Sequence, residues 1–307
     1  IWKKGEHPVL NPPMDVTVEE EDQIFLLAED DDQIFLSDID PGLIVEEYIR
    51  HMQTEVHEPE KILILGWNRK AERILLEMDH YIPKNSRILV VANPAYVKKA
   101  PSWDNIKLNR AKLKFQYGIT TDRDQLEKLV PKDYQHIILL SYSDDLSYQV
   151  ADARTMITLL HLRDMANKCE DCQFSVVSEM LDLRNRELAE VTEVDDFIVS
   201  DFFISLYLSQ VSEIKLLNAV FQNLLESEGS EVYLRPARDY VVLGEPVNFY
   251  TVVESARRKD EVALGYRIDA EGNDPEKTYG IHLNPKKSQT YRYQTDDQII
   301  VLSEELM

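Results

Sequence analysis

Short apolar runs alternate with helical patterns over the middle of the chain. The apolar runs read KILILG (61–66), RILVVAN (87–93), KLKFQYG (112–118), HIILLSY (136–142), FSVVSEM (174–180) and DDFIVSD (195–201). Each is short enough for a strand and rich in residues that favour strands. Continuous apolar strands separated by helices indicate a parallel sheet that is buried on both faces.

The segments between these runs predict the covering helices. RKAERILLEMDHYI (69–82) places its apolar residues on one helical face, and further helices are expected over DRDQLEKLV (122–130) and over 147–167. The fold class is therefore α/β, with a Rossmann-like, doubly wound parallel sheet over 61–201.

A long helical pattern follows over 202–228 and is expected to stop at Gly229, a typical C-terminal glycine cap. Its apolar residues are spaced by three or four, at Ile204, Leu208, Val211, Ile214, Leu217, Phe221 and Leu224. A helix of this kind serves either as core or as a partner-binding surface, and we interpret it as crossover and interface helices.

Residues 229–307 change to short strands around one helix, which predicts a smaller α+β lobe. The expected strands are SEVYLRPA (230–237), DYVVLG (239–244), EVALGYRI (261–268) and DQIIVLSEE (297–305), and the expected helix is NFYTVVESARRK (248–259). This lobe also contains the second copy of an internal repeat.

The repeat joins Leu-Asn-Pro to Asp-Gln-Ile, at 10–24 and again at 283–299. Asn-Pro favours a turn, and Asp-Gln before branched residues suits the entry into an edge strand. We therefore interpret 1–40 as the tail of a preceding small lobe plus an acidic linker, and 41–60 as a connecting helix. A further DQIFL at 32–36 has no Leu-Asn-Pro before it and is assigned to that linker, with its role open.

Charge and cysteine content narrow the function. The 307 residues include 56 acids and 34 bases, a net charge of −22, which disfavours nucleic acid and anionic lipid as partners. No apolar run reaches the ~20 residues of a membrane span. The only cysteines, Cys169 and Cys172, are expected to be two surface thiols of a reduced, cytosolic protein.

The first strand–helix turn lacks the residues of a dinucleotide site. After Gly66 the second glycine of Gly-x-Gly-x-x-Gly is Asn68 and the third is Ala71, and the acid expected after the second strand is Asn93. We therefore expect no NAD. No catalytic motif is found either, so the chain is not expected to be an enzyme.

The strand ends carry acids instead. Asp144 and Asp145 follow the fourth strand, Glu179 lies in the fifth and Asp201 follows the sixth. Carboxylates at the ligand-binding edge could hold Ca²⁺, which takes six to eight oxygen ligands. The alternative is that these acids cap the helices that follow.

Several segments resemble the cytosolic part of CASTOR/POLLUX-type ion channels, in a copy that looks bacterial. They are GWNRKAERILLEMDHYIPKNS (66–86), VVSEMLDLRN (176–185) and NFYTVVESARRK (248–259). The resemblance implies two tandem RCK units (regulators of ion conductance) in the cytoplasmic portion of an integral membrane protein. It also implies a homo-oligomer, a tetrameric gating ring joined to its own transmembrane pore region, in a cation channel regulated by calcium.

Two other functions remain open at this point. One is a nucleotide-sensing regulatory subunit of a potassium uptake system (TrkA-like), which would use the first strand–helix turn. The other is an oxidoreductase. Asn68 and Ala71 argue against nucleotide binding at that turn.

Overall fold

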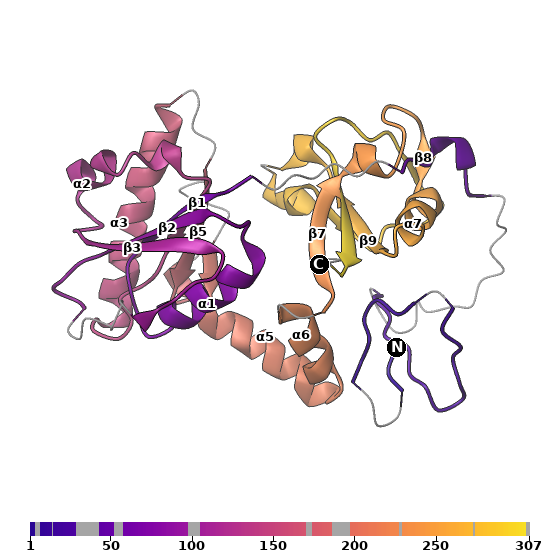
Figure 1. Cartoon of the computed structure of the whole chain (residues 1–307), viewed down its shortest axis with the longest axis horizontal. Helices are drawn as coiled ribbons and strands as arrows, with labels where there is room; N and C mark the ends of the chain where they lie inside the picture. Colours follow the sequence, from indigo (N-terminus) through magenta and orange to yellow (C-terminus); the bar gives the residue numbers. More distant parts are fainter. Residues whose placement is uncertain are drawn as a thin grey trace. The chain divides into compact units, whose positions relative to one another are not determined.

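The computed structural model describes residues 1–3, 7–13, 15–28, 43–51, 58–97, 105–169, 174–185, 197–226, 229–272 and 274–304. The chain forms two compact units (Figure 1). One comprises His57–Glu213, and the other combines Ile1–Val56 with Ile214–Met307.

The unit His57–Glu213 is built on a parallel sheet of six strands, as the apolar runs predict. The strands are β1 (Lys61–Leu65), β2 (Ser86–Ala92), β3 (Ala111–Tyr117), β4 (His136–Leu139), β5 (Ser175–Met180) and β6 (Phe197–Val199). Their order is β3-β2-β1-β4-β5-β6, and every pair is parallel. This is the order of doubly wound sheets, with the reversal between β1 and β4.

Helices cover both faces of this sheet (Figure 1). Helix α1 (Ala71–Tyr81) packs its Leu75 on one face, whereas α2 (Arg123–Lys128) and α3 (Tyr148–Asn167) pack on the other. Within β1, Ile62 and Ile64 face α1, and Leu63 and Leu65 face α2 and α3. Because neither face of the sheet is exposed to solvent at β1, this strand is apolar at every buried position.

The helical pattern over 202–228, which we interpret as crossover and interface helices, corresponds to two helices and not to one continuous helix. Helix α5 covers Ser200–Glu213 and α6 covers Leu217–Leu225, so the second ends before Gly229. A tight turn separates them, closed by the Leu217 N–H donating to the Ile214 carbonyl at 3.0 Å. The turn contains neither glycine nor proline, and the apolar residues keep their spacing of three or four across it. The sequence pattern therefore gives no sign that the helix is interrupted. No helix in the described ranges is long and apolar enough to cross a bilayer.

The other unit contains the predicted small α+β lobe. Its antiparallel sheet has the order β10-β9-β12-β7, from β7 (Glu231–Pro236), β9 (Val262–Arg267), β10 (Ile281–Leu283) and β12 (Gln298–Ser303). Strands β8 (Val247–Asn248) and β11 (Thr290–Tyr291) form a separate pair. Helix α7 (Phe249–Arg257) is capped by the Asn248 side chain, which accepts the Thr251 N–H at 2.9 Å.

Two expectations about this unit are corrected. DYVVLG (239–244) is not a strand, because Tyr240 and Val241 are both buried after a 3₁₀ turn and Val241 makes only an isolated bridge with Ile49. A strand would turn consecutive side chains to opposite faces. The described part of 41–60 contains a one-turn 3₁₀ helix, Glu46–Tyr48, where a connecting helix is predicted.

The two copies of the repeat share a turn but not a strand. Asp22 accepts the Glu19 N–H at 2.9 Å, and Asp297 accepts the Gln294 N–H at 2.8 Å in the same way. In the first copy the described residues form only an isolated antiparallel bridge, Trp2 with Gln23, whereas the second enters β12. The expected strand at 22–24 is therefore wrong, since one bridge supplies no ladder. The copy at 32–36 lies outside the described residues.

The expectation of a free thiol is wrong for Cys169. This residue follows α3 and is disulfide-bonded. The chain has one other cysteine, Cys172, which lies outside the described residues.

Candidate functional site

The candidate site lies at the carboxyl edge of the parallel sheet, where the strand order reverses between β1 and β4. Ligands of open α/β sheets bind at this point. Gly66 directly follows β1 and has a φ of 101°, and a Cβ there would lie 2.0 Å from the Leu140 carbonyl oxygen. The turn from β1 to α1 therefore passes so close to the end of β4 that only glycine fits.

Asn68 fills this turn with a side chain. It is 2% exposed, and its Nδ2 donates to the Ser141 carbonyl and to Glu179 Oε2, both at 2.8 Å. Its Oδ1 accepts the Lys70 N–H at 3.0 Å. In dinucleotide-binding sheets this position is a glycine that lets the backbone approach the pyrophosphate. The expectation of no NAD stays a prediction, and the position of Asn68 supports it.

Glu179 in β5 is the centre of the site. It is 8% exposed, and its Oε2 accepts the Ser141 N–H at 3.1 Å as well as the Asn68 amide. Its Oε1 forms an ion pair with Lys70 Nζ and lies 3.4 Å from Ser200 Oγ. Both carboxylate oxygens are thus occupied by donors from the same chain.

Asp144 is held beside this cluster by the β1–α1 turn. Its Oδ2 accepts the Arg69 N–H at 2.6 Å, and its Oδ1 lies 3.8 Å from Arg69 Nε. The Arg69 side chain is 85% exposed, so the ion pair itself is worth little. The backbone hydrogen bond is what ties the loop after β4 to the turn after β1.

Aromatic side chains and a backbone amide contact one another at the carboxyl end of β2. The Asn93 N–H donates to Tyr142 Oη at 2.8 Å, and burial raises the pKa of the Tyr142 hydroxyl. Tyr96 packs on Tyr142 with ring centroids 5.1 Å apart, and the Arg154 guanidinium lies 4.8 Å from the Tyr96 centroid. A dinucleotide-binding sheet would place a ribose-binding acid here.

A second buried carboxylate, Asp152 of α3, orders the segment after β5. It is fully buried and accepts the N–H groups of Leu181 at 2.9 Å and Asp182 at 3.0 Å. The Asn185 amide donates to it at 2.7 Å. Sequence reasoning missed both Asp152 and Lys70, because a single polar residue in a helical pattern carries no signal of its long-range partner.

The four predicted cation ligands share this edge of the sheet but do not converge. Glu179 is paired with Lys70, and Asp144 is bonded to Arg69. Asp145 lies in the turn after β4, where its N–H donates to the Tyr142 carbonyl at 3.3 Å, and Asp201 lies in the first turn of α5. Within the described ranges, no three His, Cys, Asp or Glu side chains are grouped to hold a metal. Their role as ligands stays a prediction.

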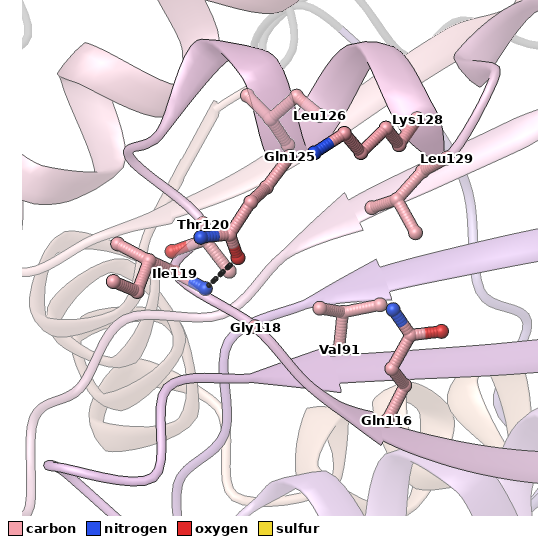
Figure 2. A pocket seen from close by; sticks show the side chains of 9 residues that line it. All are labelled: Val91, Gln116, Gly118, Ile119, Thr120, Gln125, Leu126, Lys128 and Leu129. Carbon is pink, nitrogen blue, oxygen red and sulfur yellow. Dashed lines mark hydrogen bonds between the residues drawn. The ribbon is translucent and has the colours of Figure 1, made fainter.

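A mainly apolar pocket lies beyond the ends of β2 and β3, against α2 (Figure 2). Gln125 reaches from α2 into its rim, where its Oε1 accepts the Ile119 N–H at 2.7 Å and its Nε2 donates to Asp122 at 3.1 Å. Both polar atoms of the Gln125 amide are therefore hydrogen-bonded to the loop that precedes α2. The lining residues are Val91, Gln116, Gly118, Ile119, Thr120, Gln125, Leu126, Lys128 and Leu129, which include no acid–base pair.

The chain is similar in sequence to several plant proteins. It is 27% identical to "Probable ion channel POLLUX" of Oryza sativa subsp. japonica over 99% of the chain and 34% of that protein. It is 30% identical to "Probable ion channel POLLUX" of Arabidopsis thaliana over 96% of the chain and 39% of that protein. It is 26% identical to "Ion channel DMI1" of Medicago truncatula over 97% of the chain and 37% of that protein. No family model matches the chain.

The fold is similar to that of a solved gating ring. "Structure of the human SLO3 gating ring" matches with a TM-score of 0.53 at 10% identity, over 80% of this chain and 44% of that chain. At this identity the similarity establishes the fold alone, which agrees with the predicted RCK architecture. The sequence similarity covers nearly the whole chain but only about a third of the curated relatives. Over nearly its whole length the chain is therefore similar to a segment of proteins named CASTOR/POLLUX-type ion channels.

Proposed function

We propose that the chain is the regulatory, gating-ring portion of a cation channel and lies on the cytoplasmic side of the membrane. The observation that carries this proposal is the sequence similarity to proteins named ion channels over 96–99% of the chain. The fold of the SLO3 gating ring supports it. The channel activity itself would belong to a pore region elsewhere in the protein, and this segment would act by biasing that pore without catalysing a reaction.

The proposed assembly is a homo-oligomer, a tetrameric ring. Helix α5 supports it, because none of its residues is buried and several large apolar side chains are half exposed. Phe203 is 52% exposed, Ile204 53% and Leu208 60%. An apolar helix surface of this kind is typical of a protein interface. Packing against another subunit would remove it from water.

The proposed regulator is a cation such as Ca²⁺, bound at the acidic strand ends. Coupling between two sites is typically ~1–3 kcal/mol, and a gate needs ~5.5 kcal/mol to move from 1:99 to 99:1. Four equivalent sites in a ring would supply this free energy if each contributed about 1.4 kcal/mol, which lies within the typical range. In this proposal Asp144, Asp145 and Asp201 would supply oxygen ligands, and Glu179 could join them only after leaving Lys70.

The proposal is tested on the full-length channel that contains this segment. In excised patches, Ca²⁺ applied to the cytoplasmic face should change the open probability, and deletion of the segment should remove that response while current remains. A channel whose response to cytoplasmic cations is the same with and without the segment would contradict the regulatory role.

The cation site is tested separately on the purified chain. Calorimetry should show saturable Ca²⁺ binding at micromolar to millimolar concentrations, and Asp144→Asn with Asp145→Asn should weaken it by about 10-fold or more, because two charged oxygen ligands are lost. The matched control is Glu19→Gln with Glu20→Gln, two exposed acids that change the net charge equally. Equal loss in both double variants would indicate diffuse charge attraction rather than a site.

A further inference from the structure

We propose that the carboxylate of Glu179 is a built-in ligand of an anion-binding cradle at the switch point of the sheet. The cradle is formed by Asn68, Lys70, Ser141 and Ser200, and in the native chain it is closed by Glu179 itself. Removal of this carboxylate would leave a site for a small oxyanion or carboxylate. The inference does not use the channel role, so each can fail without the other.

The donors of the cradle come from segments far apart in the chain and meet at one carboxylate. Asn68 Nδ2 lies 2.8 Å from Oε2, and the Ser141 N–H donates to the same oxygen at 3.1 Å. Lys70 Nζ pairs with Oε1, which Ser200 Oγ also approaches at 3.4 Å. Without Glu179 these groups would be an ammonium, an amide, a backbone N–H and a hydroxyl, which together carry one positive charge.

The donors are held in place independently of Glu179. Asn68 is fixed by the Ser141 carbonyl at 2.8 Å and by the Lys70 N–H at 3.0 Å. Lys70 Nζ also contacts Ser200 Oγ at 3.3 Å. Because these contacts would survive the loss of the carboxylate, the cradle would remain assembled and ready to accept another anion.

The position of the cradle explains why an anion belongs there. It lies in the β1–α1 turn and at the end of β4, where doubly wound sheets bind the phosphates of their ligands. Here Asn68 replaces the glycine of that turn, and a carboxylate from β5 takes the place of an external anion. Charge-assisted donors of this kind bind carboxylate and phosphate oxygens alike.

The cradle also joins α5 to the sheet. Ser200 is the first residue of α5, and its hydroxyl is within hydrogen-bond reach of both Lys70 and Glu179. The start of the helix with the exposed apolar residues is therefore tied to β5 and to the β1–α1 turn. Loss of the Glu179 carboxylate removes one of these two contacts of Ser200 and leaves the contact with Lys70, so an empty cradle should weaken this junction without separating it. A bound anion should strengthen it again.

The test is chemical rescue of the variant Glu179→Ala. Its melting temperature should fall below that of the native chain and should rise saturably, by about 2–4 °C or more, with sodium formate, acetate or phosphate compared with sodium chloride at equal ionic strength. The native chain should show no such difference, because its cradle is filled. A Glu179→Ala protein that responds to these anions no more than to chloride would overturn the proposal.

Two controls separate this effect from general salt stabilisation. Leu75→Ala removes a fully buried side chain of α1 and should be destabilised without any specific response to the anions. The double variant Glu179→Ala with Lys70→Met should lose the response, since the only positive charge of the cradle is gone. A double variant that responds as strongly as Glu179→Ala would also overturn the proposal.

The experiment remains decisive if Glu179→Ala does not fold in chloride. Refolding from urea should then give a folded fraction that increases at least several-fold with formate, acetate or phosphate. Glu179→Gln keeps the shape of the side chain, so it should fold and should show no response to the anions. Absence of anion-dependent recovery in Glu179→Ala would count against the cradle.

Discussion

Among single residues, Asn68 connects the first strand–helix turn to the strands beside it. Its amide donates to the Ser141 carbonyl and to Glu179, and its carbonyl oxygen accepts the Lys70 N–H. A buried amide with all these partners is satisfied, and replacing it leaves the partners without hydrogen bonds. The contribution of Asn68 is therefore structural, and its role in excluding a dinucleotide stays a prediction.

Asn68→Ala is expected to lower the free energy of unfolding by about 1–3 kcal/mol, because a buried acceptor and a buried carboxylate lose their donor. Urea denaturation of the purified chain measures the change. The control is Asn105→Ala at an exposed position, which should stay within about 0.5 kcal/mol of the native chain. Equal effects of the two substitutions would show that the network around Asn68 adds nothing.

Among the elements, α7 carries a charge network between side chains three and four positions apart. Glu254 is followed by arginines at the third and fourth positions, and it bonds Arg257 Nε at 2.7 Å and Arg258 Nε at 2.8 Å. Arg258 also reaches Glu46 of the preceding segment. The hydrogen bond from Arg257, aided by that from Arg258, lowers the pKa of Glu254 from 4.5 to about 2.

This lowered pKa predicts an acid dependence of stability. The folded pKa of Glu254 is below its unfolded value, so its contribution is complete above pH 4.5 and is lost as the pH falls through about 2. The native chain should exceed Glu254→Gln in unfolding free energy by about 1–2 kcal/mol at neutral pH, a value reduced by the exposure of Arg257. The difference should shrink between pH 4.5 and 2.

Chemical denaturation across this pH range measures the difference between the two proteins. Glu47→Gln, an exposed acid in the short 3₁₀ turn, is the control and should follow the native chain at every pH. A gap between the native chain and Glu254→Gln that stays constant from pH 7 to 2 would contradict the assignment of the pKa shift.

At the scale of the whole molecule, the exposed apolar surface of α5 and the fold similarity to a gating ring both support the proposed self-association. In the chain taken by itself, Leu208 is 60% exposed, and other large apolar side chains of the same helix are exposed as well. Burying one such side chain stabilises a contact by about 1.5–3 kcal/mol. Repeated around a closed ring, that contribution would favour assembly over the isolated chain.

Leu208→Glu is therefore expected to weaken self-association by about 10- to 100-fold, since it replaces a buried apolar contact with a charge. Sedimentation velocity over a range of protein concentrations measures the change. The control is Leu160→Glu on α3, an equivalent substitution at a leucine that is 46% exposed. If both variants associate as the native chain does, α5 is not the interface.

Much of the parallel sheet was predictable from the sequence, whereas its polar edge was not. The apolar runs locate all six strands. The central strand β1 is apolar at every buried position because both faces of the sheet are covered, whereas the edge strand β3 alternates apolar and polar residues. The second lobe was harder to predict, since DYVVLG has the composition of a strand but packs as a buried turn. For the candidate site, the sequence indicated its location at the strand ends and the absence of the phosphate-binding glycines. It did not indicate which side chains form hydrogen bonds and ion pairs with one another there.

The sequence by itself determined the features that depend on neighbours along the chain. These are the strands and their covering helices, the shared turn before both Asp-Gln-Ile copies, and the replacement of phosphate-binding glycine by Asn68. Only the tertiary structure decided that Lys70 meets Glu179, which lies 109 positions further along the chain. The physical reason is that the sequence shows the same acidic residue whether water, a metal ion or a lysine compensates its charge. Only folding brings the actual partner within hydrogen-bonding distance of the carboxylate.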